Sequence, residues 1–332
     1  MRWSQLSLAL SVGILSLGTG ISPSSGWLLV ANKANNAMGI IDPAAARQVA
    51  EVPEGGVTGH EIIASPDGKF AYVPIYGNSG VGLPGTDGNN MIVIDLSTRK
   101  VVGNVDFGKG VRPHCPKFGP NGLLYVSTEL DRTITIIDPT TLKIVGTIPT
   151  GQPESHMLAI TRDGKRGYTA NVGPGTVSVL DMEGRKTLAI IPVSGQVQRI
   201  SLSVDDSMVF TSDVTKPQLA VIDTATNKLK AWIPMPSLGY GSATTADGKW
   251  LLIALPLVNQ LAVIDLTEMK VARTIDMPTH PQEVLVSPDQ KVAYVSSDQT
   301  GRVAAVSLSD WKVASVIDAG KGADGLAWAV AQ

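Results

Sequence analysis

Apolar and polar residues alternate in short runs along almost the whole chain, and this two-residue period predicts β-strands rather than helices. The runs are rich in Val, Ile and Tyr, and clusters of Gly, Pro, Asp and Asn separate them. Typical examples are the strand at 71–73, the turn at 65–68 and the hairpin at 133–148. No segment of useful length has a helical period, so we expect an all-β protein.

One unit of an apolar strand, a turn and a second strand recurs seven times. From the second copy onward the starting points are 42 residues apart, and only the first interval is longer, at 54 residues. The copies begin at His60, His114, His156, Gln198, Tyr240, Gln282 and Asp324. A period near 40 residues with four strands per unit is typical of a propeller blade. The expected fold is therefore a seven-bladed β-propeller with four antiparallel strands per blade.

The two ends of the chain hold complementary incomplete units. The last copy, 324–330, has no partner strands after it, whereas 27–33, 37–41 and 48–52 are a second, third and fourth strand with no first strand before them. We expect one blade to be shared between the N- and C-terminal strands, which closes the ring. A linear β-solenoid is the alternative, but it would not need such complementary ends. Residues 27–332 are thus expected to form a single propeller domain.

Four of the units carry related tripeptides: Tyr72-Val73-Pro74, Tyr125-Val126-Ser127, Tyr168-Thr169-Ala170 and Tyr294-Val295-Ser296. In these motifs the chain resembles the YVTN-repeat β-propeller family over almost all of residues 27–330. The resemblance implies a shared scaffold under many roles. Those roles include propeller lactonases and sugar-acid lyases, and the repeat also resembles the propeller portions of d1-haem and copper reductases.

The N-terminal residues 1–26 carry one charge, Arg2, followed by an apolar run and a Gly/Ser/Pro stretch. This pattern predicts a signal peptide and hence a periplasmic or secreted protein without a membrane span in the mature chain, and an uncleaved anchor is the alternative. The net charge of −2 and pI of about 6.1 give no basis for binding nucleic acid. Cys115 is the only cysteine, so no intramolecular disulfide can form, and we expect a monomer.

All four histidines fall in loops that lead into first strands, on the face that we call the upper mouth. His60, His114 and His156 open the first strands of three consecutive blades, and His280 lies two residues before Gln282. Three imidazoles that converge near the axis could bind one divalent metal ion, such as Zn, Mn, Fe or Cu. Gln198, Glu61 or Glu154 would supply a further oxygen ligand. In the alternative interpretation, these histidines hydrogen-bond the backbone of neighbouring blades.

Other polar residues of the same face complete the predicted ligand site. They are Tyr76, Arg112, Gln198, Arg199, Tyr240, His280, Gln282 and Asp324. The two arginines could hold a carboxylate or phosphate group, or could pair with acidic residues of the rim. The longer first interval comes from a Gly-rich insertion at 76–90, which is either a lid or a tolerated surface loop. Its GxGxxG spacing is not followed by a helix, so a dinucleotide site is not expected.

Three functions fit this pattern. The first is an exported propeller that binds a small ligand, a metal ion or an exported protein partner at the upper mouth. The second is a metal-dependent lyase or hydrolase acting on a lactone, ester or sugar acid, with His280, Tyr240 or Glu154 moving protons. The third is a role in respiratory or metal traffic. The sequence has no CxxCH, HExxH, P-loop or GxSxG motif, so several enzyme classes lack their usual signature.

Overall fold

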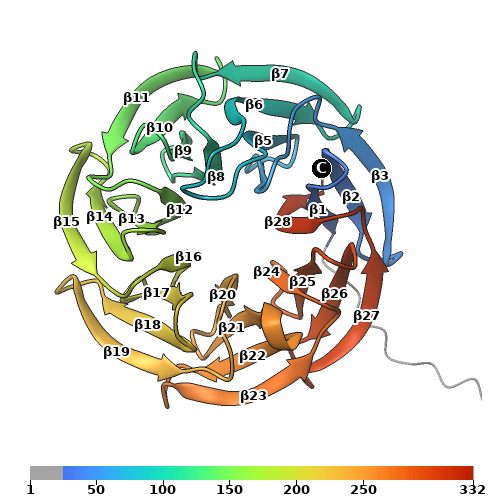
Figure 1. The fold of residues 1–332 in the computed structure, drawn as a ribbon. Coiled ribbons are helices and arrows are strands. Elements are labelled where there is room, and N and C mark those ends of the chain that lie inside the picture. Colours follow the sequence, from blue (N-terminus) through green and yellow to red (C-terminus); the bar gives the residue numbers. More distant parts are fainter. Residues whose placement is uncertain (1–24, 332) are drawn as a thin grey trace, which may run out of the picture.

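The computed structural model describes residues 25–331, and they form seven four-stranded antiparallel sheets arranged as blades around a central axis (Figure 1). The fold is therefore a seven-bladed β-propeller, as the sequence predicts. Blade 1 contains β28 (Ala323–Val330), β1 (Gly26–Asn32), β2 (Ala37–Asp42) and β3 (Arg47–Pro53); blade 2 contains β4 (Ile63–Ala64), β5 (Phe70–Gly77), β6 (Asp87–Asp95) and β7 (Lys100–Asp106). Blade 3 contains β8 (Pro113–Phe118), β9 (Leu124–Thr128), β10 (Thr133–Asp138) and β11 (Lys143–Pro149); blade 4 contains β12 (Ser155–Ile160), β13 (Arg166–Asn171), β14 (Thr176–Asp181) and β15 (Lys186–Pro192).

The remaining three blades repeat the same order from the axis outward. Blade 5 contains β16 (Val197–Leu202), β17 (Met208–Asp213), β18 (Gln218–Asp223) and β19 (Lys228–Pro234); blade 6 contains β20 (Ser242–Thr244), β21 (Trp250–Leu255), β22 (Gln260–Asp265) and β23 (Lys270–Asp276). Blade 7 contains β24 (Pro281–Val286), β25 (Val292–Ser297), β26 (Arg302–Ser307) and β27 (Lys312–Asp318). Within residues 25–331, the helical content is one 3₁₀ turn at Pro256–Val258, after β21.

Blade 1 joins the two ends of the chain. Its innermost strand, β28, pairs antiparallel with β1, with Leu28 opposite Trp328 and Leu29 opposite Ala327. Two further backbone hydrogen bonds, from the amides of Lys33 and Ala34, extend this pairing above the strands. The predicted shared blade is thus confirmed, and Figure 1 shows the C-terminal strand beside the first one.

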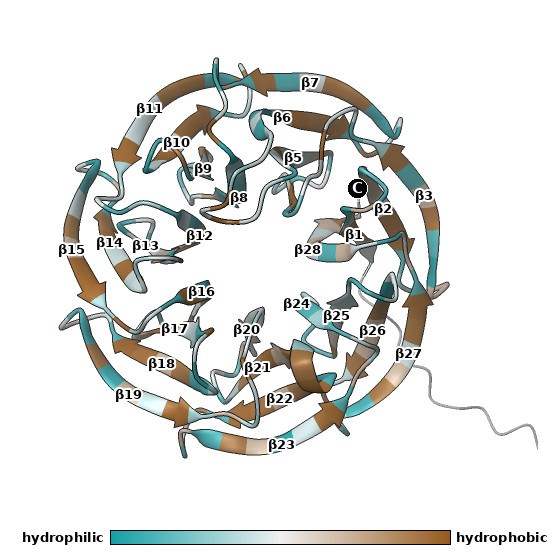
Figure 2. Ribbon diagram, in the orientation of Figure 1, coloured by the Kyte–Doolittle hydropathy of each residue, from teal (hydrophilic) through white to brown (hydrophobic). Residues whose placement is uncertain are grey.

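The hydrophobic core lies between neighbouring blades. The second and third strands of each blade are almost wholly buried, and they are mostly brown in Figure 2, whereas the outer strands alternate between exposed and partly buried residues. In one such layer, Leu29 and Ala31 of blade 1 belong to the same buried cluster as Ile62 and Val73 of blade 2. Burial on both faces explains why these strands consist of continuous apolar runs.

The turns after the third strands lie on the face opposite the upper mouth and use an aspartate in most blades. In blade 3 the Oδ1 atom of Asp138 accepts a hydrogen bond of 2.8 Å from the amide of Thr140, and Asp265 accepts the same bond from Thr267 in blade 6. These bonds are typical of Asx turns. The aspartates therefore shape these turns.

The described residues contain no helix long and apolar enough to cross a membrane. The predicted signal peptide, residues 1–26, falls almost entirely outside the described part of the chain, which begins at Ser25. Export therefore stays a prediction. Cys115 is buried in the cluster that β8 shares with β12 of the neighbouring blade.

Candidate functional site

The backbone at the entrance to the first strands positions the side chains of the upper mouth. Two residues before the ring position the chain has a positive φ in five blades, at Thr58, Arg112, Glu154, His280 and Gly322. A register shift then interrupts the pairing of the first strand with the second, for example between Ser155 and Met157 in blade 4. Such bulges re-aim side chains at the ends of strands.

Three histidines and one tyrosine pack together at this mouth. The rings of His114 and His156 are stacked, with centroids 3.5 Å apart and an interplanar angle of 28°. The ring of His60 lies 5.6 Å from that of His114, and the ring of Tyr76 lies between 5.1 and 5.6 Å from all three imidazoles. The structure therefore brings the three predicted metal ligands to one place and adds Tyr76 at their centre. We call these four residues the histidine cluster.

Two imidazoles of the histidine cluster are buried and the third is half-buried. His114 and His156 are 2% and 4% exposed, and within residues 25–331 the Nδ1 atom of each has no hydrogen-bond partner. Burial lowers the pKa of His60 to about 4 and holds the pKa of His114 well below its usual value. Neutral imidazoles keep a lone pair available at neutral pH. An unpartnered buried polar atom is costly, so these two nitrogens are a feature that needs an explanation.

Glu129 connects the histidine cluster to Arg112. The hydroxyl of Tyr76 donates to Oε2 of Glu129 at 2.5 Å, and the same oxygen lies 3.4 Å from Nδ1 of His156, without hydrogen-bond geometry. Nη1 of Arg112 donates to Oε1 of Glu129 at 3.3 Å. Burial disfavours the carboxylate, but its contacts with His156 and Tyr76 outweigh this effect and lower the pKa of Glu129.

The Gly-rich insertion is tied down over this network. Arg112 donates to the carbonyl oxygens of Gly80 and Leu83, and its Nε atom lies 2.7 Å from Oδ1 of Asp87. The amide of Gly82 donates to Glu129 at 3.3 Å. The insertion is therefore an ordered cover beside the histidine cluster. Arg112 is 4% exposed and paired with carboxylates. Of the two roles considered for the arginines, pairing with acidic residues of the protein therefore describes Arg112 better than binding the anionic group of a ligand.

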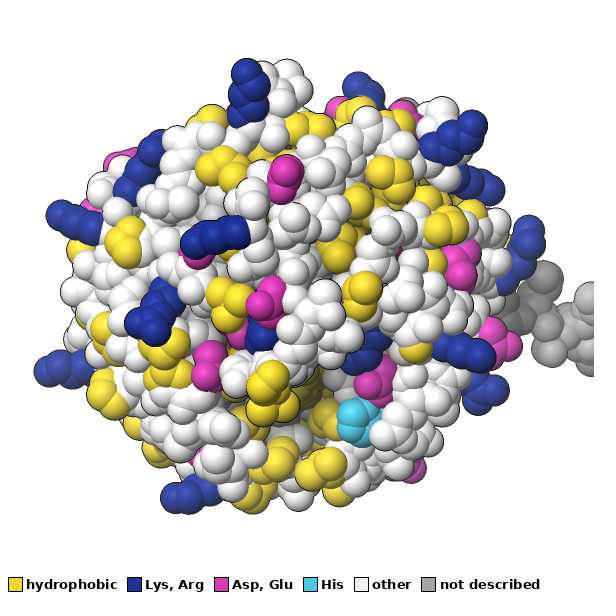
Figure 3. All heavy atoms as spheres, turned by 45° about the horizontal axis from the view of Figure 1, so that its top comes forward, with side chains coloured by type: hydrophobic (Ala, Val, Ile, Leu, Met, Phe, Trp, Pro, Cys, Tyr) yellow, Lys and Arg dark blue, Asp and Glu magenta, His cyan; other side chains and the backbone are white. Residues whose placement is uncertain are grey.

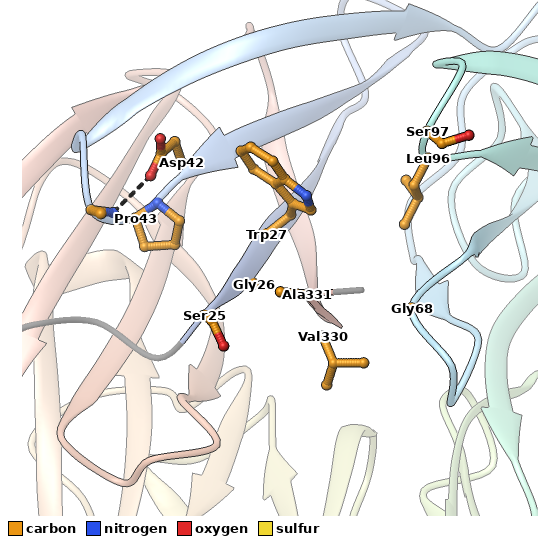
Figure 4. A pocket seen from close by; sticks show the side chains of 11 residues that line it. Ser25, Gly26, Trp27, Asp42, Pro43, Gly68, Leu96, Ser97, Val330 and Ala331 are labelled. Atoms are coloured by element: carbon orange, nitrogen blue, oxygen red, sulfur yellow. Dashed lines mark hydrogen bonds between the residues drawn. The ribbon is translucent and has the colours of Figure 1, made fainter.

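A cavity of about 360 Å³ opens between the insertion and blades 3 and 4. It is lined by Gly82, Leu83, Pro84, Arg112, Glu129, Leu130, Arg132, Pro153 and Glu154. Glu154 accepts a hydrogen bond from the amide of Gly173 at 2.7 Å, and a side chain at Gly82 would collide with the Glu154 carboxylate. Cavities of about 370, 460 and 570 Å³ lie away from the histidines, and Figure 4 shows the one of about 460 Å³, between Trp27, Leu96 and Val330.

Arg199 reaches across the axis from blade 5. Its Nη1 atom donates to Glu61 of blade 2 and, at 2.8 Å, to Glu283 of blade 7, while Nη2 donates to Asp324 of blade 1 at 3.2 Å. The guanidinium also lies 4.4 Å from the ring centroid of Tyr240. Arg199 therefore connects distant blades through buried ion pairs. Like Arg112, it pairs with acidic residues of the protein.

The opposite side of the mouth is more open and holds the fourth histidine. Nδ1 of His280 lies 2.7 Å from Oδ1 of Asp298 and also 2.7 Å from the side-chain amide of Gln282. Lys33 bridges Asp298 and Asp324 at 3.5 and 3.1 Å. The His280 side chain is 29% exposed. Of the other predicted ligand residues, Gln198 donates to the hydroxyl of Tyr240 at 3.1 Å.

The donor atoms of the mouth do not form a metal-chelating set as arranged. Within residues 25–331, no group of three or more His, Cys, Asp or Glu side chains could hold a metal ion. The face-to-face stacking of His114 and His156 is one reason, because ligands of a common ion must converge on it. In the space-filling view, acidic side chains and histidine lie beside a hollow near the axis (Figure 3).

Sequence reasoning did not single out Glu129, Asp298 or Lys33. Each lies one residue beyond a second strand, after β9, β25 and β1 respectively. Glu129 and Asp298 stand four residues after the motif tyrosines Tyr125 and Tyr294, as Tyr76 does after Tyr72. This repeat position was the signal that could have identified them.

Comparisons with known proteins support the fold and give limited information on function. No family model matches the chain. Over 89 residues, which are 26% of this chain, the sequence is 32% identical to dihydro-heme d1 dehydrogenase of Pseudomonas aeruginosa. That match spans 18% of the dehydrogenase.

Solved structures share the propeller over nearly the full chain. Hydrazine synthase of Kuenenia stuttgartiensis superposes with a TM-score of 0.74 at 18% identity, covering 90% of this chain and 99% of that chain. The dihydro-heme d1 dehydrogenase NirN in complex with DHE gives a TM-score of 0.67 at 15% identity, covering 93% and 76%. A functionally unknown protein from Desulfotomaculum acetoxidans gives 0.75 at 12% identity, covering 93% and 100%. At these identities the likeness shows the fold alone.

Proposed function

We propose that the protein binds a small ligand at the upper mouth and that this ligand is an iron tetrapyrrole of the dihydro-heme d1 type. The observation that carries the proposal is the histidine cluster, in which two buried Nδ1 atoms, those of His114 and His156, have no hydrogen-bond partner among residues 25–331. A protein retains such unpaired polar atoms at a cost in stability, and a ligand that uses them explains the cost.

The identity of the ligand is inferred from the comparisons. A dihydro-heme d1 dehydrogenase shares 32% identity with part of this chain, and the structure of such an enzyme in complex with DHE shares the fold. Iron in a tetrapyrrole already has four nitrogen ligands, so it needs only one or two from the protein. It therefore does not require the three-donor group that the described residues lack.

The neighbouring cavity suits the polar edge of such a ligand. The side chain of Arg132 lines this cavity, is exposed and has no recorded ion pair within the described residues, unlike Arg112 in the same wall. A guanidinium of this kind binds carboxylate groups. We therefore infer that Arg132 receives a carboxylate of the ligand.

The proposal is tested by titrating the purified protein with haem and with dihydro-heme d1 while following visible absorption and thermal unfolding. Tyr76→Phe, which removes the hydroxyl bound to Glu129, should weaken binding, whereas Tyr72→Phe at the opposite-face cavity serves as the matched control. Binding of neither tetrapyrrole to the wild-type protein would overturn the proposal.

A bare divalent ion held by His60, His114 and His156 is the second candidate, because the three rings lie within 5.6 Å of a neighbour. It would require the stacked rings to turn. Elemental analysis of the purified protein tests it, and screening of lactones, esters and sugar acids then tests the lyase or hydrolase activity.

The monomeric state also stays a prediction, to be measured by light scattering.

A further inference from the structure

His280 differs from the other histidines in having its ring orientation fixed by a carboxylate. Oδ1 of Asp298 lies 2.7 Å from Nδ1 of His280, and Lys33 balances the charge of Asp298 from 3.5 Å. The backbone of His280 is fixed as well, since its amide donates to Oδ1 of Asn259 at 2.9 Å. Contacts of both the backbone amide and the ring therefore fix the position of His280 at the mouth.

This contact determines which ring nitrogen is free. A carboxylate only accepts hydrogen bonds, so the 2.7 Å contact is attractive when Nδ1 carries the proton. The amide of Gln282, at the same distance from Nδ1, accepts through its oxygen once the amide plane is turned over. In this tautomer Nε2 has a lone pair. A histidine whose other nitrogen donates to a carboxylate is the usual arrangement of a metal ligand.

The three residues of the histidine cluster are less suited to approach a large disc-shaped ligand. His114 and His156 are almost fully buried, and each covers a face of the other. The ring of His60 packs against Tyr76 and His114, and no carboxylate of residues 25–331 forms a hydrogen bond that fixes its tautomer. An axial ligand must project its nitrogen into open space, and the 29% exposed side chain of His280 meets this condition.

We propose that Nε2 of His280 is the axial protein ligand to the iron of a bound tetrapyrrole and that Asp298 is its positioning residue. This inference rests on the proposed function. The histidine cluster then lies beside the ligand and does not ligate its iron.

The test is a titration with haem, followed by its absorption spectrum in the ferric and ferrous states. We expect His280→Gly to lose the spectrum of an imidazole-ligated iron and free imidazole to restore it. Glycine suits this position, because His280 has a φ of 62°. Asp298→Asn should keep the ligand but weaken binding, roughly 10- to 100-fold, and shift the spectrum. His60→Ala tests the histidine cluster as the alternative source of the iron ligand, and Tyr72→Phe at the opposite-face cavity is the control, which should leave the spectrum unchanged.

The outcomes separate the two proposals. If wild-type protein binds haem and His280→Gly retains the imidazole-ligated spectrum without added imidazole, the assignment of His280 is overturned while tetrapyrrole binding stands. If His60→Ala loses the spectrum instead, the ligand belongs to the histidine cluster and the assignment is likewise overturned. If the wild-type protein binds neither haem nor dihydro-heme d1, both proposals fail. Circular dichroism of each variant checks that the propeller has folded.

Discussion

On one side of the upper mouth, His60, His114 and His156 are packed against one another and against Tyr76, whereas on the other side His280 stands apart beside Asp298. We call these the closed half, formed by blades 2–4, and the open half, formed by blades 7 and 1. The histidines of both halves come from the segment that enters a first strand, although His280 stands two residues before the ring position. They differ in what surrounds the imidazoles: other rings in the closed half, and a carboxylate with partial exposure in the open half.

The difference shows how one scaffold gives the same residue type two chemical characters. Burial lowers the pKa of His60 and of His114 in the closed half, and two buried nitrogens there have no hydrogen-bond partner among the described residues. A carboxylate in the open half fixes a tautomer and keeps one nitrogen available. Substitutions in the closed half should therefore change stability or ligand affinity, whereas substitutions in the open half should change the ligation of the iron and leave stability almost unchanged.

The largest effect is expected from Glu129→Ala in the closed half. This change leaves Arg112 with one of its two carboxylate partners and the hydroxyl of Tyr76 with none. Breaking a buried ion pair costs about 3–5 kcal/mol, so the free energy of unfolding should fall by that amount in denaturant titrations. Asp298→Ala in the open half is the control, and an equal loss there would remove the distinction between the halves.

A smaller effect of opposite sign is expected from His114→Phe. The new ring keeps the stack with His156 and removes an unpartnered buried nitrogen, whose cost is about 1–3 kcal/mol. The free energy of unfolding should hold or rise while tetrapyrrole affinity falls. A fall in both quantities would mean that His114 is a structural residue with an internal partner.

The pH dependence of stability gives the next effect. The pKa of His60 falls to about 4 through burial, from 6.5 in the unfolded chain, so its contribution is present above pH 6.5 and is lost as the pH falls towards 4. Burial raises the pKa of Glu54 to about 7, from 4.5, so its contribution is present below pH 4.5 and is lost as the pH rises through 7.

These two contributions oppose each other between pH 4.5 and 6.5. Glu54→Gln removes one of them, so stability should then fall more steeply on acidification than in the wild type, by up to about 1.4 kcal/mol per pH unit. Glu283, whose pKa burial also raises to about 7, contributes with the same sign as Glu54 and remains in the variant. Superimposable pH profiles of the two proteins would contradict this account.

The smallest change in stability is expected for Asp298→Asn in the open half. The Asp298 side chain is 17% exposed, and partly exposed ion pairs contribute less than about 1 kcal/mol. The ¹⁵N shifts of the His280 ring should nevertheless show loss of the single tautomer. Unchanged ring shifts would mean that Asp298 does not orient His280.

The period of the repeat was enough to predict the architecture. It specified the number of blades, the shared blade and the position of each ring residue along the channel axis. The grouping of His60, His114 and His156 follows because these residues have the same position along the channel axis and their blades are adjacent. How the rings meet does not follow, since side-chain packing decides whether two imidazoles stack or converge.

Side-chain contacts across the channel axis could not be predicted from the repeat, for a different reason. Arg199 pairs with Glu61, 138 residues away in the sequence, because a long side chain crosses the channel. The period of the repeat predicts which blades are neighbours around the ring, but it does not predict ion pairs between blades on opposite sides of the channel. Asp298 and Glu129 were missed because only the residues that open the first strands were compared, and not those that follow the second strands.

The pairing of β28 with β1 has a consequence for how this molecule can be made or broken. Six of the blades form from consecutive strands alone, whereas blade 1 forms only when β28 pairs with β1 from the far end of the repeat series. Removal of β28 by proteolysis would leave the inner edge of β1 open to pairing with foreign chains. Closure of the ring therefore depends on a contact between two strands that are far apart in the sequence.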